Sequence, residues 1–476
     1  MKSRKDQVQA YFFVVGRLAA AVTHGKPDAL ESPSKRMTTG TVLGFVLAAV
    51  TMGVFGVFGM FVPSTGNTSW KQDGAIVMDE TSGARYVYLA GQLRPVLNYS
   101  SARLVAGQSG GQLTSVSPGS LAGTPVGQPI GIAGAPDSLP AADKVTGGPW
   151  TVCTQLPGSA AAAPSASISV LLGHAPGSVL NEGQAYYVSA PSGELYLVTR
   201  GKRFKLPSSS AAVALGYGTS RPIEAPSLWL NTIAQGPDFV AQEVPDLGRP
   251  GPVIDGKQTL VGQIYQARNP AIGTEQNYLV RRDGLAALSR TGAALLLSAP
   301  STRQAYPDGP IEAVRVTPDA LSGVAISATA GIANDLPPTP PEVVTPPQGS
   351  QPCVRQDPSA GPEQAMVAEY LPDNQVAQAS VPLGTHQAGM TADRVAIPAG
   401  RGLLARDLPA PGATAGVTYL VTEVGEKYPL ADTETITALG YAGSAAVPIP
   451  MRLLDLLPTG PVLSTNAARQ AQAVRS

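Results

Sequence analysis

The chain has 476 residues, and its 33 basic and 33 acidic side chains give a formal net charge of zero at pH 7. This length allows one large core or several small ones, and the balanced charge argues against a nucleic-acid-binding surface. Charged residues make up 14% of the chain and aromatic residues 5%, a bias that by itself indicates no function.

Residues 1–40 form a short basic segment. In it "VQAYFFVVGRLAAAV", from Val8, places apolar residues almost all round an amphipathic helix, and "GKPDALESPSKR" ends that helix. Exposed Tyr11, Phe12 and Phe13 are unfavourable in isolation, so we expect this helix to dock on a partner or lie in the membrane interface. Forty residues are too few for a catalytic domain.

The stretch from Thr41 to Val62 contains no charged residue. Twenty-two helical residues reach about 33 Å, which is enough to cross a hydrocarbon core of about 30 Å. A cleaved signal has an apolar region of only about 7–15 residues and a small-residue cleavage site. "FVPSTGN" has no such site, so the sequence favours an uncleaved transmembrane helix over a signal or a core helix.

Flanking charge predicts the orientation of this span. Residues 1–40 carry seven basic and three acidic side chains, whereas residues 63–476 carry 26 basic and 30 acidic ones. By the positive-inside rule the N-terminus is cytoplasmic and the remaining chain is extracytoplasmic.

A short phrase recurs four times in the outer part. Each copy has a Tyr-Leu pair, a glycine three to six residues after the tyrosine, a second apolar stretch and a helix-like run. The pairs begin at Tyr88, Tyr196, Tyr278 and Tyr419, and the glycines are Gly91, Gly201, Gly284 and Gly425. We interpret each copy as strand, tight turn, strand and helix, with glycine supplying the turn dihedrals.

The second and fourth copies agree further. Both contain "ALGY", from Ala214 and Ala438, and both continue into a proline-led run, at Pro226 and Pro450. Proline suits the first turn of a helix, so these two copies are predicted to carry a second helix. Ser208, and Asp432 or Thr433, are candidate N-caps of the first helices.

The sequence therefore predicts an α+β chain with one N-terminal transmembrane helix and an elongated outer part, in which four β-hairpin/helix repeats surround a central domain. A hairpin with one or two helices buries its apolar face poorly alone, so the copies should share a centre. The predicted segments are repeats at about 74–107, 183–240, 258–298 and 413–464, central parts at about 108–180 and 299–410, and a disordered tail at 465–476.

The two central parts contain the only two cysteines, Cys153 and Cys353. Two cysteines on the oxidising side of a membrane suggest one disulfide, with two buried free thiols as the alternative. The bond would close a loop of about 200 residues, worth roughly 5 kcal/mol in the chain-entropy model. "LPPTPPEVVTPPQG" at 336–349 is expected to be an extended connector before Cys353.

Together these features resemble EccB, a membrane core component of type VII (ESX) secretion systems. The residues that carry the resemblance are 7–22, "SPSKRMTTGTVLGFVLA", 74–105, the "ALGY" phrases and the two cysteines. The resemblance implies a short cytoplasmic N-terminus, one span, and four outer repeats around a disulfide-held central domain. It also implies assembly with an FtsK/SpoIIIE-type ATPase and with further copies of the chain, and export of small helical proteins. "KPDALE" departs from the more basic stretch that the family leads us to expect.

ATP hydrolysis has been proposed for this family, but the sequence shows no P-loop. The Gly-Lys pairs at Gly25, Gly201 and Gly256 are not followed by Ser or Thr, as a P-loop requires. "GQSGG" at 107–111 matches G-x-S-x-G only formally, because a nucleophile elbow needs a strand before it and a helix after it. We therefore predict no cofactor, with ATP suggested by family analogy alone.

The histidines and the basic cluster give no stronger signal. His24, His174 and His386 lack neighbours at metal-ligand spacing, so no metal site and no catalytic residue are predicted. "RGKRFK" at 200–205 is interpreted as a solvated turn and edge strand, with contact to an acidic wall polymer or a partner as the alternative. The leading hypothesis is a structural secretion subunit of the plasma membrane. The rivals are an anchored extracytoplasmic ATPase or other hydrolase, and a cell-wall binding module.

Overall fold

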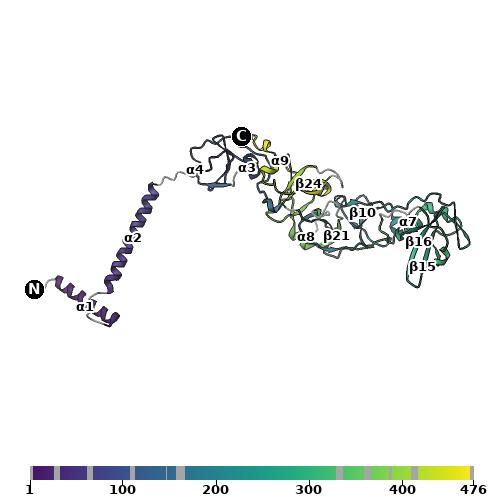
Figure 1. Ribbon diagram of the computed structural model, residues 1–476, viewed down its shortest axis with the longest axis horizontal. Helices are drawn as coiled ribbons and strands as arrows, with labels where there is room; N and C mark the ends of the chain where they lie inside the picture. The colour runs from purple at the N-terminus through teal and green to yellow at the C-terminus, as the bar shows by residue number, and fades with distance from the viewer. Residues whose placement is uncertain are drawn as a thin grey trace. The chain divides into compact units, whose positions relative to one another are not determined.

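Residues 41–61 of the charge-free stretch lie within the second of two long helices at the start of the chain. In the computed structural model these helices are α1 (Arg4–His24) and α2 (Pro33–Phe61), both labelled in Figure 1. The window Met37–Val57 has a mean hydropathy of 2.0 and is not buried within the protein. By length and composition it can cross a membrane. Val62, the predicted end of the span, lies outside the described residues.

The structure describes residues 4–25, 33–61, 68–107, 113–145, 147–156, 167–328, 336–358, 366–384, 387, 389–408 and 416–471. Contacts divide the chain into two units. One unit comprises Met1–Lys71, Met78–Ala84 and Thr114–Thr124, and the other comprises the rest. On α1 the side chains of Tyr11, Phe12 and Phe13 are all exposed, as the sequence predicted.

All four repeats share one plan that is larger than the predicted one. Three antiparallel strands are followed by a helix and by a fourth strand, which returns to pair with the first. This return is parallel between β8 and β11, between β15 and β18, and between β24 and β27. The Tyr-Leu pair lies on the second strand in every copy.

The elements of the repeats follow in chain order. Repeat 1 has β1 (Ile76–Asp79), β2 (Arg85–Leu89), β3 (Gln92–Pro95), α3 (Tyr99–Ala106) and β4 (Thr114–Val116). Repeat 2 has β8 (Gln184–Ser189), β9 (Leu195–Thr199), β10 (Lys202–Leu206), α5 (Ser209–Ala214), β11 (Ile223–Glu224), α6 (Ser227–Asn231) and β12 (Ala234–Gln235). Repeat 3 has β15 (Ile264–Asn269), β16 (Thr274–Arg281), β17 (Gly284–Leu288), α7 (Arg290–Ser298) and β18 (Val314–Val316). Repeat 4 has β24 (Leu403–Leu408), β25 (Thr418–Val421), β26 (Lys427–Leu430), α9 (Thr433–Ala438), β27 (Val447–Pro450) and α10 (Met451–Leu454).

Turns and caps explain why the repeat phrase has its glycines and polar residues. The four predicted turn glycines have φ values of 81°, 72°, 149° and 80° in chain order, which L-residues rarely adopt. Each main helix is capped by a side chain that accepts a hydrogen bond from the backbone N–H three residues on. These caps are Asn98, Ser208, Ser289 and Asp432. Ser208 and Asp432 are confirmed, whereas Asn98 and Ser289 were not predicted.

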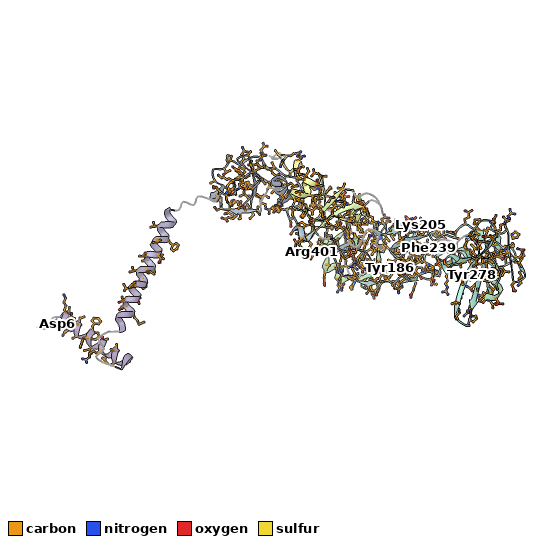
Figure 2. All side chains as sticks on the ribbon, viewed as in Figure 1. Asp6, Tyr186, Lys205, Phe239, Tyr278 and Arg401 are labelled. Carbon is orange, nitrogen blue, oxygen red and sulfur yellow. A yellow bond between two sulfur atoms is a disulfide. The ribbon has the colours of Figure 1, made fainter. Side chains whose placement is uncertain are left out.

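The central sheet has seven strands in the order β22-β23-β6-β5-β20-β21-β7. Its strands are β5 (Trp150–Thr154), β6 (Ile168–Leu172), β7 (Ser178–Val179), β20 (Ser350–Gln356), β21 (Val367–Pro372), β22 (Val381–Pro382) and β23 (Arg394–Ala396), and α8 (Asp373–Ala379) follows β21. Both predicted central parts thus contribute to one sheet. Tyr186 and Phe239, labelled in Figure 2, are fully buried, in the core of this sheet and in that of repeat 2 respectively.

Shorter helices and strands connect the repeats and the central sheet. They are α4 (Pro118–Leu121), the 3-10 helices η2 (Ala142–Lys144), η3 (Pro300–Ala305) and η4 (Pro318–Leu321), and the hairpin of β13 (Pro250–Ile254) with β14 (Lys257–Leu260). The proline-rich connector contains a short strand, β19 (Glu342–Val343), which pairs in parallel with β8.

Several predicted boundaries need correction. β4 and β18 fall in the predicted central parts but belong to the sheets of repeats 1 and 3, and β24 belongs to repeat 4. The tail is also ordered further than expected. α11 (Thr465–Ala468) is capped by Ser464, and both of its end residues are buried. Residues 472–476 lie outside the described part of the chain.

Candidate functional site

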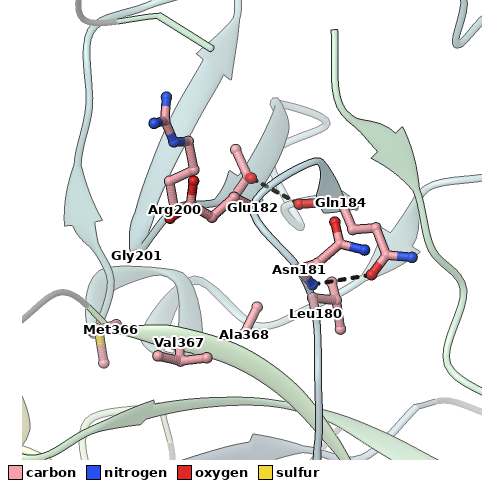
Figure 3. A pocket seen from close by; sticks show the side chains of 10 residues that line it. Leu180, Asn181, Glu182, Gln184, Arg200, Gly201, Met366, Val367 and Ala368 are labelled. Atoms are coloured by element: carbon pink, nitrogen blue, oxygen red, sulfur yellow. Dashed lines mark hydrogen bonds between the residues drawn. The ribbon is translucent and has the colours of Figure 1, made fainter. Parts of the chain in front are cut away.

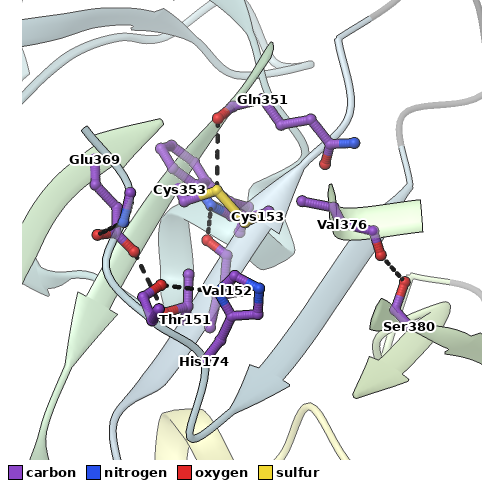
Figure 4. Close-up of a disulfide and its surroundings, with 12 residues drawn as sticks. Thr151, Val152, Cys153, His174, Gln351, Cys353, Glu369, Val376 and Ser380 are labelled. Atoms are coloured by element: carbon purple, nitrogen blue, oxygen red, sulfur yellow. Dashed lines mark hydrogen bonds between the residues drawn. A yellow bond between two sulfur atoms is a disulfide. The ribbon is translucent and has the colours of Figure 1, made fainter. Parts of the chain in front are cut away.

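The disulfide joins two neighbouring strands of the central sheet. Cys153 on β5 lies directly opposite Cys353 on β20, and both are fully buried. Figure 4 shows the bond between the strands, with α8 contributing Val376 to the same apolar cluster. The predicted Cys153–Cys353 bond is therefore present. It covalently links two strands through cysteines that are 200 residues apart in sequence.

A buried carboxylate lies in the same row of the sheet. Glu369 on β21 is the register partner of Cys353 and is fully buried. It accepts hydrogen bonds from the Gly177 N–H at 2.9 Å and the Thr151 hydroxyl at 3.3 Å. Burial raises the pKa of this carboxyl, and the two hydrogen bonds and the charge of Arg355 oppose that rise. Each of its two oxygens is therefore hydrogen-bonded within the fold.

The proline-led second helices of repeats 2 and 4 pack into one apolar cluster with the central sheet. On α6, Trp229 is fully buried, and its Nε1 donates to the Val152 carbonyl of β5 at 2.9 Å. On α10, Leu453 is fully buried in the same cluster. Arg452 then links the two helices, because its Nε donates to the carbonyl of Thr232, which caps the end of α6, at 2.7 Å. These helices therefore fix both repeats to the sheet.

Each second helix is also held at its C-terminal end by a cation from β10 or β26. We call this arrangement the helix-end clamp. In repeat 2, Arg203 donates to the Asn231 side chain at 2.8 Å and lies over the Tyr196 ring, 5.8 Å from its centroid.

The clamp of repeat 4 uses the equivalent positions. Lys427 donates to the Leu454 carbonyl at 2.6 Å, approaches Asp455 at 3.5 Å, and lies 5.9 Å from the Tyr419 ring centroid. Neither clamp is predicted by a single copy of the repeat phrase. Alignment of the two copies at Gly201 and Gly425 places the two cations at one position.

Repeat 1 packs on repeat 4, and repeat 3 packs on repeat 2. Residues of repeats 1 and 4 form one buried cluster that includes Leu104, Leu420 and Tyr441. Leu295 on α7 of repeat 3 joins the core of repeat 2. Repeats 2 and 4 thus each connect the central sheet to a further repeat.

Two of the three Gly-Lys pairs lie in hairpin turns, whereas the residue after Gly25 lies outside the described residues. Gly201–Lys202 and Gly256–Lys257 begin the second strands of hairpins, and both glycines have positive φ. The hairpin geometry is not that of a phosphate-binding loop before a helix. The stretch from Gln108 to Gly111 lies outside the described residues. Among the described residues no group of three His, Cys, Asp or Glu side chains could hold a metal ion.

The basic cluster at 200–205 is not an edge strand, which corrects the prediction. β10 pairs with β9 on one side and with β12 on the other. Lys205 forms an ion pair with Glu194 at 2.5 Å, so this cation is already matched within the fold. Of the histidines, His174 bonds its own loop through the Ala175 carbonyl, while the side chains of His24 and His386 lie outside the description.

A cavity of about 310 Å³ lies between repeat 2 and β21 (Figure 3). Leu180, Met366 and Ala368 form its apolar part, and Glu182 and Arg200 are its charged residues. Opposite charges on an apolar wall indicate no particular reaction.

Comparison with known proteins identifies the family. The family model described as type VII secretion system ESX-1, transport TM domain B (EccB) matches residues 2–475. The chain is 28% identical over 500 residues to the ESX-2 secretion system ATPase EccB2 of Mycobacterium tuberculosis, covering 99% of this chain and 95% of that one. It is 30% identical over 504 residues to the ESX-3 secretion system ATPase EccB3 of Mycolicibacterium smegmatis, covering 98% and 90%.

Solved structures share the fold. A chain of the intact ESX-5 inner membrane complex matches with a TM-score of 0.68 and 22% identity, covering all of this chain and 96% of that one. A chain of the EccB3 dimer from the ESX-3 core complex matches with a TM-score of 0.67 and 26% identity, covering 83% and 100%.

Proposed function

Because the chain belongs to the EccB family of type VII secretion proteins, we propose that it is a structural core subunit of a secretion complex in the plasma membrane. The full-length family match carries this proposal, and one apolar helix before a disulfide-stapled, sheet-rich part supports it. The subunit anchors in the bilayer and holds a rigid scaffold on its outer face for the export of small helical proteins.

The proposed orientation has the N-terminus in the cytoplasm. It rests on the basic excess of residues 1–40 and on the disulfide, which persists in oxidising compartments. Protease added to intact protoplasts should digest the part after the span and spare an N-terminal epitope tag. Digestion of the tag with protection of the outer part would reverse the assignment.

The proposed partners are other core components, including an FtsK/SpoIIIE-type ATPase, and further copies of this chain. The relatives above come from an ESX-5 inner membrane complex and from an EccB3 dimer. Gentle solubilisation of native membranes should therefore give a large particle that contains this ATPase and more than one copy of the chain. Recovery as a lone monomer contradicts the proposal.

ATP turnover is the second candidate, because the relatives are called ATPases. We test it with purified full-length chain and magnesium-ATP. ATP hydrolysis should elute together with this chain in a final size-exclusion step, and one side-chain substitution should abolish it. Both results together would establish an enzyme. For the wall-binding alternative, pelleting with purified peptidoglycan is the corresponding test.

A further inference from the structure

A cavity of about 590 Å³ opens beside the clamp of repeat 4. Three segments meet there: the turn before β23, the start of β26, and the turn after α10. Its lining residues include Met390, Thr391, Glu426, Lys427, Asp455 and Pro458.

The charges in this cavity are unequally accessible. The Lys427 side chain is only 5% exposed, and its ammonium is held by the Leu454 carbonyl and by Asp455. The Asp455 side chain is 56% exposed, and Glu426 is half-buried. A ligand that enters the cavity therefore contacts the Glu426 and Asp455 carboxylates before it contacts the Lys427 ammonium.

Glu426 is held in place for such a contact. Its Oε2 accepts a hydrogen bond from the Tyr428 hydroxyl at 2.7 Å, which restrains the side chain. A restrained carboxylate loses less conformational entropy when a donor binds it. The apolar part of the lining comes from buried Leu457 and Pro458 and from Met390, which is 65% exposed.

We propose that this cavity is a docking site for an arginine side chain presented by a protein partner. The guanidinium donates to Glu426 and Asp455, and its aliphatic stem lies along the exposed Met390 side chain. Arginine fits because its planar fork matches carboxylates and because its stem buries well against apolar surface. An exposed methionine beside a charged anchor is typical of protein interfaces rather than of sites for free ions.

Repeat 2 provides an internal comparison for this site. At the positions equivalent to Glu426, Lys427 and Asp455 it has Lys202, Arg203 and Asn231, so the acidic charge is absent there. The two repeats share the clamp, and only repeat 4 has the carboxylates. The docking site is therefore a feature of repeat 4 and not of the repeat fold.

This inference depends on the proposed function only for the existence of extracytoplasmic protein partners. The test uses full-length chain in detergent micelles with 13C-methyl-labelled methionine, and Met390→Leu assigns the reporter signal. The probe is acetyl-Gly-Arg-Gly-amide, compared with the uncharged citrulline peptide. We expect a saturable shift of the Met390 methyl signal with the arginine peptide and at least tenfold weaker binding of the citrulline peptide.

Variants locate the contact. Asp455→Asn and Glu426→Gln should each weaken binding by about five- to tenfold, as expected for loss of a partly solvated charge-assisted hydrogen bond. Asp455→Asn keeps the side-chain shape but removes a charge partner of Lys427, so the unfolding midpoint of each variant is measured beside its binding. The matched control Asp319→Asn, on the exposed helix η4 of repeat 3, should bind as the parent does.

Four results would overturn the proposal. They are no Met390 shift at 50 mM peptide, equal binding of the citrulline peptide, equal weakening by the control variant, and tighter binding of spermidine than of the peptide. Failure of the peptide to bind while the large particle still assembles refutes the docking site alone. Loss of the particle refutes the proposed function instead.

Discussion

Repeats 2 and 4 both hold the C-terminal end of their second helix with a cation, but the cation and its partners differ between them. In both, a cation over the tyrosine of the Tyr-Leu pair holds the end of the second helix. Arg203 is half-buried and donates to the exposed side-chain amide of Asn231. Lys427 is buried and donates to the backbone carbonyl of Leu454. A buried ammonium needs charged and carbonyl partners, because its desolvation is unfavourable. Repeat 4 accordingly has Asp455 where repeat 2 has Asn231.

The disulfide tests whether the central sheet supports both repeats equally. Replacing Cys153 and Cys353 together by serine removes the staple across 200 residues. We expect the free energy of unfolding to fall by roughly 5 kcal/mol in the chain-entropy model. Hydrogen exchange followed by mass spectrometry should show faster exchange on α6 and α10 alike. Faster exchange on one helix alone would show that the sheet supports the repeats unequally.

The buried side chains of the second helices give the next largest effect. Trp229→Ala should lower the free energy of unfolding by about 3–5 kcal/mol, because it opens a cavity and removes the hydrogen bond from the indole to the Val152 carbonyl. Leu453→Ala should lower it by about 2–5 kcal/mol. Urea unfolding followed by circular dichroism measures both. Val213→Ala, on the exposed side of α5, is the control and should change it by less than about 0.5 kcal/mol.

The features that sequence could predict are those encoded within a few residues. The turn glycines, the Ser208 and Asp432 caps and the helices after Pro226 and Pro450 each depend on local backbone chemistry. "ALGY" is local too: Gly216 and Gly440 end the helices at positive φ, and the next tyrosine is buried. The disulfide was predictable because only one pairing exists.

The missed features depend on distant partners. β18 has three residues, and its partner β15 lies before a whole helix, so no local pattern marks it. Lys427 has no local signal of burial, because the residues of α10 that cover it lie more than 20 positions further along the chain. Neither the clamps nor the cavity beside repeat 4 has a signal in a single copy. Alignment of repeats 2 and 4 with each other is the sequence signal that indicates the clamps.

The third prediction concerns two glycines at equivalent positions of repeats 2 and 4. A Cβ at Gly236 would overlap the Phe204 ring, and one at Gly460 would overlap the Tyr428 ring. Gly236→Ala and Gly460→Ala should therefore each lower the free energy of unfolding by about 1–3 kcal/mol. A Cβ at Gly443 meets nothing within 4 Å, so Gly443→Ala is the matched control. If all three variants behave alike, the close ring packing is not what selects glycine.

The last prediction separates the two clamps by their pH dependence. Burial lowers the pKa of Lys427, and the charge of Asp455 opposes this shift. Between that lowered value and the ordinary lysine pKa of 10.5, the unfolded chain binds more protons than the folded chain. The contribution of Lys427 to the free energy of unfolding therefore increases as pH rises through this window, by about 1.4 kcal/mol for each unit of the shift.

Glu426, Asp455 and Tyr419 surround this lysine, and burial raises the pKa of the Tyr419 hydroxyl above its usual value. Urea unfolding from pH 8 to 10.5 should show the lysine-linked rise in the parent chain and its loss in Lys427→Met. Tyr419→Phe controls for the tyrosine and should keep the rise. Arg203→Met should keep it as well, because the repeat 2 clamp contains no lysine. A rise that persists in Lys427→Met would mean that another group titrates, and the proposed chemical difference between the clamps would be wrong.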